Sequence, residues 1–199
     1  MLFIFFLLSG CGDKLSTSTP DESANITKAL LTGTWTSNCS DNTTASTSSK
    51  TVLVFSASGD NLTATTTNYS DLSCVTQSFV FTKKLNTLVL ESNKPTTSQN
   101  QIIKKFTAVV TGITLQPKTS YASTSLYSSS FCGLTGWSII TETSIAGQTC
   151  GSVTYNAVND SHSDIIQINS EKTFIRLGNI SNAASTGYPK TLYTQEYYK

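Results

Sequence analysis

Most of the chain alternates apolar and polar residues with a period of two, which is typical of half-buried β-strands. β-Branched residues dominate these segments, and polar clusters such as Ser-Gly-Asp-Asn at residues 58–61 predict the turns between them. Helical periodicity is absent apart from one turn expected within residues 23–31, while residues 116–130 fit neither pattern. The predicted strands are residues 33–39, 51–57, 62–69, 75–81, 86–91, 101–110, 113–115, 153–158, 164–168 and 173–177, with a strand or short helix at 137–143 and a Tyr-rich strand after a tail.

About nine to eleven short strands, mostly joined by short polar turns, predict an all-β fold. An open sheet of this size would leave strand edges exposed, whereas closure removes them. We therefore expect an antiparallel up-and-down barrel or a strongly curled sheet.

The first residues are apolar without interruption, from Leu2 to Leu8, and are followed by Ser9, Gly10 and Cys11. Such a run is too short to span a bilayer as a helix but fits the apolar core of a signal peptide. Leu8-Ser9-Gly10-Cys11 resembles the lipobox of bacterial lipoproteins, which implies cleavage before Cys11 and acylation of this cysteine. The lack of Lys or Arg beside Met1 departs from a typical signal peptide and indicates an upstream start or a minimal leader.

These features divide the chain into a signal peptide at residues 1–10, a flexible lipidated tether at 11–26 and a single β domain at 27–199. We expect the protein in the bacterial cell envelope, anchored through acylated Cys11 to membrane lipid. Gly12 rather than Asp follows Cys11, which favours the outer membrane if sorting follows the common rule.

Four cysteines remain after Cys11, and an even number in a secreted chain indicates two disulfides with three alternative connectivities. We choose Cys39–Cys74 and Cys132–Cys150, because each pair then closes a moderate loop within its own half of the chain. A metal site is the alternative, but no Cys-x-x-Cys or close His/Cys spacing is present. No metal and no cofactor are therefore expected.

The charge pattern restricts the partners. The formal net charge is +1, so the chain lacks the basic surface that nucleic acid requires. Arg176 is the only arginine, which excludes phosphate or carboxylate clamps built from several guanidinium groups.

Gly33-Thr34-Trp35, in the first predicted strand, resembles the G-x-W signature of lipocalins. In that family the tryptophan closes one end of the barrel and an arginine of the last strand packs across it. The resemblance implies that Gly33, Trp35 and Arg176 form this closure, with the guanidinium stacked on the indole. More closely, the chain is similar to uncharacterised bacterial lipoproteins with a lipocalin-like pattern, in residues 33–39, 69–74, 132–137 and 177–178. That similarity implies a fold and an envelope location but no activity.

His162 is the only histidine and lies among hydroxyl and carboxylate residues at 159–164. A Ser/His/Asp device or a metal ligand is one interpretation, but neighbours on a turn point in different directions. We favour the alternative, a polar turn before the strand at 164–168.

Aromatic residues in the middle and C-terminal region are better functional candidates. A barrel of this size either holds a small ligand or is filled by its own side chains. The candidate ligand-binding residues are Tyr121, Tyr127, Phe131, Trp137 and Tyr155.

The sequence therefore predicts a non-catalytic, lipid-anchored binding module for a small apolar ligand. The alternative is a structural or protein-interaction lipoprotein with a solid barrel and an envelope protein as partner. A third hypothesis, an envelope hydrolase, requires His162 to meet an acid and a nucleophile.

Overall fold

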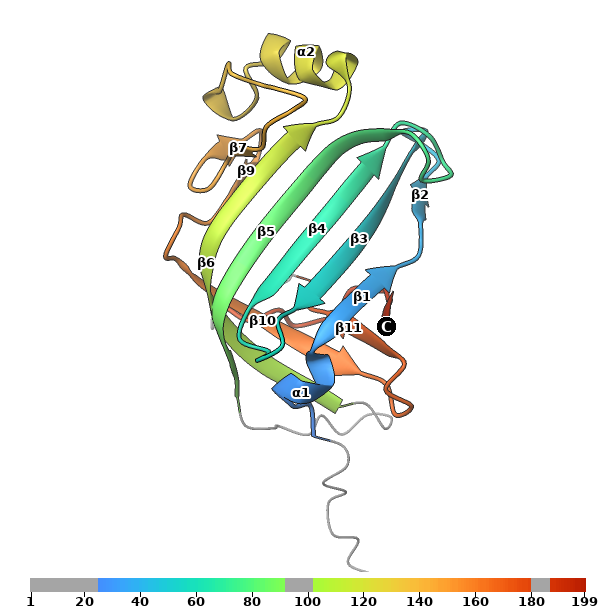
Figure 1. The fold of residues 1–199 in the computed structure, drawn as a ribbon, viewed down its shortest axis with the longest axis vertical. Coiled ribbons are helices and arrows are strands. Elements are labelled where there is room, and N and C mark those ends of the chain that lie inside the picture. Colours follow the sequence, from blue (N-terminus) through green and yellow to red (C-terminus); the bar gives the residue numbers. More distant parts are fainter. Residues whose placement is uncertain (1–24, 92–101, 180–186) are drawn as a thin grey trace, which may run out of the picture.

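The computed structural model describes residues 25–91, 102–179 and 187–199. In these ranges an antiparallel sheet closes into a ring of eight strands, because β1 pairs with both β3 and β12 (Figure 1). Each ring strand pairs with the next ring strand along the chain, so the order is up-and-down as expected. The ring strands are β1 (Gly33–Ser37), β3 (Thr47–Phe55), β4 (Leu62–Tyr69), β5 (Gln77–Leu90), β6 (Ile102–Pro117), β10 (Ser161–Ile168), β11 (Phe174–Leu177) and β12 (Tyr197–Tyr198).

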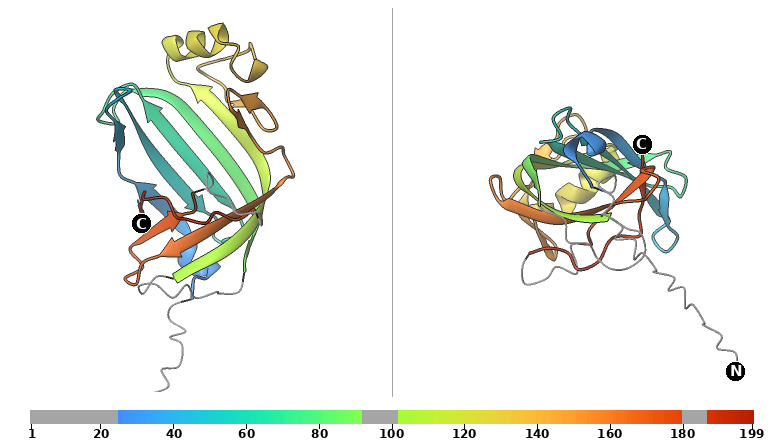
Figure 2. Two further views of the ribbon diagram at one scale, coloured as in Figure 1. Left: turned by 180° about the vertical axis from the view of Figure 1, so that it is seen from behind. Right: turned by 90° about the horizontal axis from the view of Figure 1, so that it is seen from below.

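The remaining elements are short and lie beside the ring or between its strands. β2 extends the sheet beyond β3, β7 pairs with the end of β6, and β8 and β9 form a separate hairpin. Figure 2 shows the sheet from behind, where β10 and β11 cross one half of it and the insertion between β6 and β10 lies at the other end. These elements are α1 (Lys28–Leu31), β2 (Ser40–Asn42), α2 (Ser120–Ser128), the 3-10 helix η2 (Phe131–Gly133), β7 (Thr143–Ser144), β8 (Thr149–Cys150) and β9 (Val153–Thr154).

The α1 end of the ring is closed by apolar side chains. Ile26, Leu31 and Trp35 are fully buried, and the indole of Trp35 donates a hydrogen bond of 2.7 Å to the carbonyl of Leu31. The buried Lys104 donates to the carbonyl of Ile26 at 2.9 Å. The sequence analysis extends the tether to residue 26, but Ile26 is fully buried and packs in the hydrophobic core.

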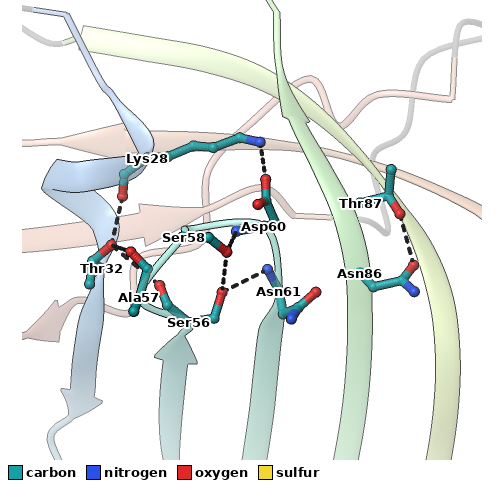
Figure 3. Close-up of polar contacts among 9 residues, drawn as sticks. All are labelled: Lys28, Thr32, Ser56, Ala57, Ser58, Asp60, Asn61, Asn86 and Thr87. Carbon is teal, nitrogen blue, oxygen red and sulfur yellow. Dashed lines mark hydrogen bonds and ion pairs between the residues drawn. The ribbon is translucent and has the colours of Figure 1, made fainter.

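Polar contacts join α1 to the turn between β3 and β4 (Figure 3). The ammonium of Lys28 pairs with the carboxylate of Asp60, and the hydroxyl of Thr32 donates to the carbonyl of Ser56 at 3.3 Å. The turn at residues 58–61 was predicted from the sequence, and here it fixes the position of α1.

Two strands each join a pair of segments that the sequence pattern predicted as separate strands. β5 runs without a break through Lys83 and Lys84, which were expected to connect two strands, and β6 joins the two segments predicted at 101–110 and 113–115. Irregular pairing between β5 and β6, near Lys84, shifts the register where the alternation changes. Local irregularities therefore looked like strand ends in the sequence.

α2 is a helix in the region for which the sequence gave no assignment. The hydroxyl of Thr119 accepts a hydrogen bond of 3.1 Å from the amide of Ala122 and so caps the helix. The segment 137–143, expected as a strand or helix, has neither form before β7 begins at Thr143. Among the described residues, no helix is long and apolar enough to cross a membrane.

Both expected disulfides are present. Cys39–Cys74 joins the residues after β1 to the loop that follows β4. Cys132–Cys150 joins η2 to β8 inside the insertion between β6 and β10. The pairing expected within each half of the chain is therefore confirmed.

Candidate functional site

A pocket of about 390 Å³ lies between the inner face of the sheet and the insertion at residues 118–160. This volume falls within the range of roughly 300–1,000 Å³ that is typical of small-molecule sites. Most of the lining is apolar, with few polar groups. The lining residues are Thr66, Asn68, Phe79, Phe81, Leu115, Leu126, Phe131, Ile145 and Tyr155.

One wall of the pocket consists of neighbouring strands of the sheet. Thr66 of β4 pairs with Phe81 of β5, which pairs in turn with Leu115 of β6. Because side chains in a strand alternate between two faces, this cross-strand row points to one side. Phe79 and Asn68 form the next row on the same face. The alternation of β4, β5 and β6 therefore builds this wall.

The opposite wall comes from the insertion. Leu126 is a buried residue of α2, and Ile145 directly follows β7. The ring of Tyr155 lies 5.6 Å from that of Phe81 on the opposite wall. Phe131 precedes Cys132, so the Cys132–Cys150 disulfide ties this part of the wall to the β8–β9 hairpin. Burial raises the pKa of Tyr155, and its phenol stays protonated at neutral pH.

The aromatic candidates from the sequence fall into three groups. Phe131 and Tyr155 line the pocket. Trp137 is buried with its ring 6.2 Å from that of Phe131, and it supports the wall from behind. Tyr121 and Tyr127 are 85% and 59% exposed and do not line the pocket. The other lining residues were not predicted: those on β4, β5 and β6 have the pattern of ordinary strand positions, and Leu126 and Ile145 lie in segments to which the sequence gave no clear assignment.

A polar cluster lies on the same inner face, formed by Lys83, His162 and Asp164. Lys83 Nζ is 3.1 Å from His162 Nδ1, and His162 Nε2 is 3.7 Å from Asp164 Oδ2. The imidazole also packs edge-on against the buried ring of Phe106. The side chains of His162 and Asp164 are only 11% and 7% exposed.

The expectation that His162 lies on an exposed turn was wrong. The turn ends at Asn159 and Asp160, and β10 begins at Ser161, three residues earlier than predicted. His162 and Asp164 then point inward together with Ile166, because alternate residues of a strand share a face. The polar composition of residues 159–164 concealed this alternation.

Two backbone amides hold the Asp164 carboxylate in place, and its charge acts on neighbouring ionisable groups. Asp164 Oδ1 accepts hydrogen bonds from the backbone amides of Ile165, at 2.7 Å, and Gly178, at 3.0 Å. Burial lowers the pKa of Lys83, while the charge of Asp164 acts in the opposite direction. Burial and the nearby Asp164 carboxylate raise the pKa of Tyr197 to about 12. The charge of Asp164 therefore acts on both Lys83 and Tyr197.

The closure expected from Gly33, Trp35 and Arg176 needs one correction. Gly33 and Trp35 lie at the expected positions in β1, but Lys199 Nζ, not a guanidinium, lies 5.2 Å from the Trp35 ring centre. Arg176 pairs with Glu196 and lies over Phe174. Its neighbour Ile175 points into the core, so alternation directs Arg176 to the outer face.

Within the described residues, no group of three or more His, Cys, Asp or Glu side chains could hold a metal ion. Cys11, the predicted lipidation site, lies outside these residues. The sequence matches no protein-family model, and a search of the curated proteins found no match either.

Proposed function

We propose that this chain is a lipid-anchored cell-envelope protein that binds a small, largely apolar ligand in the pocket beside α2. The pocket carries this proposal, because about 390 Å³ lined mainly by Phe, Leu and Ile side chains favours apolar molecules. Thr66 and Asn68 add hydrogen-bonding groups on one wall that could orient such a molecule. The lipobox-like sequence before Cys11 supports the anchor.

Binding of an uncharged apolar dye, N-phenylnaphthylamine, tests the proposal through the rise in its fluorescence on leaving water. We expect the protein to bind this dye. Leu126→Trp replaces the leucine side chain with a bulky indole, which should fill part of the pocket from α2. This variant should bind the dye at least about tenfold more weakly, equivalent to roughly 1.4 kcal/mol.

Tyr127→Trp is the matched control, since it makes the same residue one position along the same helix, where the side chain is exposed and outside the pocket. This variant should bind the dye as the unchanged protein does. Equal binding by both variants, or no binding by the unchanged protein, would refute the pocket as the binding site. Failure of the unchanged protein to bind the dye would favour the alternative hypothesis, a structural or protein-interaction lipoprotein with a solid barrel.

A further inference from the structure

Lys83 is a partly buried amine without a carboxylate in direct contact. The ion pairs of the described ranges are Lys28–Asp60, His162–Asp164 and Arg176–Glu196, and none of them includes Lys83. The hydrogen-bond partner of its Nζ is the imidazole of His162. Burial disfavours the charged ammonium more than the nearby charge of Asp164 favours it, so the pKa of Lys83 is lowered toward the neutral amine.

Lys83 lies next to the pocket wall on β5, although it is not one of the residues that line the pocket. Lys83 is two residues after Phe81 on the same face of β5. The cross-strand row of Lys83, with Ala64 and Ile113, is therefore the next row on that face after the row of Phe81, Thr66 and Leu115. Two residues along a strand correspond to about 7 Å, which the four-carbon stem of lysine can span. A ligand that reaches this nitrogen must therefore extend beyond the pocket lining by about one residue pair of β5.

The cluster also has the arrangement that activates a nucleophile. An activated nucleophile needs a base within hydrogen-bond reach, and the base needs a third group that orients it. Here the Lys83 amine lies within hydrogen-bond distance of His162 Nδ1, Nε2 lies 3.7 Å from Asp164 Oδ2, and two backbone amides donate to Asp164. The three side chains come from two strands that flank β6.

We propose that Lys83 forms a reversible imine with an aldehyde or ketone whose apolar chain fills the pocket, with His162 transferring protons and Asp164 orienting the imidazole. This inference rests on the proposed binding function of the pocket. It names the ligand class as apolar carbonyl compounds, and it requires one covalent bond per bound molecule without turnover.

The step balances without a redox partner. The lone pair of the Lys83 nitrogen attacks the carbonyl carbon, a C–N bond forms, and the C=O π electrons move to oxygen. His162 removes a proton from nitrogen and returns one to oxygen, which gives a carbinolamine. His162 then carries the remaining N–H proton from nitrogen to the hydroxyl, which leaves as water, and the nitrogen lone pair forms the C=N bond of the neutral imine. Addition of water reverses the sequence.

Reductive trapping tests the inference on the full chain. The protein is incubated with octanal at equimolar concentration and cyanoborohydride at neutral pH, and the alkylated lysines are mapped by peptide mass spectrometry. Lys83 should be modified at least about tenfold faster than Lys84, its exposed neighbour on the opposite face of β5. Formaldehyde, which has no apolar chain to fill the pocket, should lack this preference.

Variants separate the roles of the cluster. Lys83→Met should abolish the preferred modification, whereas Lys84→Met should leave it unchanged. His162→Gln should slow trapping at Lys83 by about tenfold or more while N-phenylnaphthylamine still binds, because the imidazole acts on protons and not on the apolar contacts. Equal trapping rates in the His162→Gln variant and the unchanged protein would overturn the role given to His162.

The outcomes distinguish this inference from the proposed function. If the dye binds but octanal modifies Lys83 no faster than Lys84, the imine is refuted and the pocket remains a reversible site. If octanoate displaces the dye and octanal is not trapped, Lys83 acts as a charged anchor for acids, which also overturns the inference. If neither dye nor aldehyde binds, the proposed function itself fails.

Discussion

At the scale of single residues, the position of Asp164 depends on the missing side chain of Gly178. The Gly178 amide donates to Asp164 Oδ1, and a β-carbon at residue 178 would contact this oxygen and come within 2.6 Å of Pro189 Cγ. No flexible side-chain end could move aside there, since a proline ring and a hydrogen-bonded carboxylate occupy the space. Glycine is therefore required by packing rather than by its backbone angles.

Gly178→Ala should lower the free energy of unfolding by about 1–3 kcal/mol, as overpacking does in other cores. Urea unfolding followed by tryptophan fluorescence measures this change. Gly136→Ala is the control, because a β-carbon there meets nothing within 4 Å. Equal midpoints for the two variants would show that the structure around Asp164 gives way easily, and that the cluster is not rigidly held.

At the scale of elements, β5 and β6 serve two purposes, because each contributes to the closed ring and to the pocket wall. The period-two pattern predicted their existence and the all-β fold, since alternation directly reflects one buried face. It did not predict their length. The alternation is interrupted where β5 and β6 pair irregularly near Lys84, and Gly112 interrupts the apolar pattern of β6, so both places resemble strand ends in the sequence.

The site was less predictable than the fold. Phe131 and Tyr155 were chosen for residue type, and the structure places them on the wall, but Tyr121 and Tyr127 share that type and point to solvent. Their positions depend on α2, a helix rich in Ser and Tyr whose weak amphipathic pattern gives no signal. Contacts between strands that are not neighbours in sequence, such as that of Lys83 on β5 with His162 on β10, join residues 79 positions apart and have no local signature.

The two disulfides act on different elements and should have separable effects. Replacing either pair by serine should cost about 3–4 kcal/mol of stability by the chain-entropy argument. Cys132–Cys150 holds the insertion that forms one pocket wall, so its loss should also weaken dye binding. Cys39–Cys74 lies on loops outside the pocket lining, and its loss should leave binding unchanged wherever the protein is folded.

Dye titration and thermal unfolding of the two double-serine variants measure these effects side by side. Each titration is made at a temperature at which the variant is still folded. Dye affinity that falls equally in both variants would contradict the assignment of Cys132–Cys150 to the pocket wall.

At the scale of the whole molecule, the described chain begins at the end of the ring opposite to the pocket. On β4, Leu62 follows the turn that contacts α1, whereas Asn68 lines the pocket. These residues are six positions apart, or about 20 Å along a strand. α1 and α2 lie at opposite ends of the sheet (Figure 1), so a chain anchored through the residues before α1 would carry the pocket beside α2 at the end away from α1.

The proposed lipid anchor at Cys11, which is inferred from the sequence alone, can be tested directly. When the full chain is produced in a bacterium with an outer membrane, the protein extracted from membranes should begin at Cys11 and carry acyl chains on that residue. Several acyl chains give stable attachment, since each buried methylene contributes about 0.8 kcal/mol. Intact-mass and N-terminal peptide analysis detect the cleavage and the added mass together. Cys11→Ser removes the thiol that the lipid requires and leaves all four paired cysteines in place, so this variant should fold with both disulfides and leave the membrane fraction. A membrane-bound Cys11→Ser variant, or an unmodified chain that still begins at Met1, would refute the anchor while leaving the pocket and its chemistry open to the tests above.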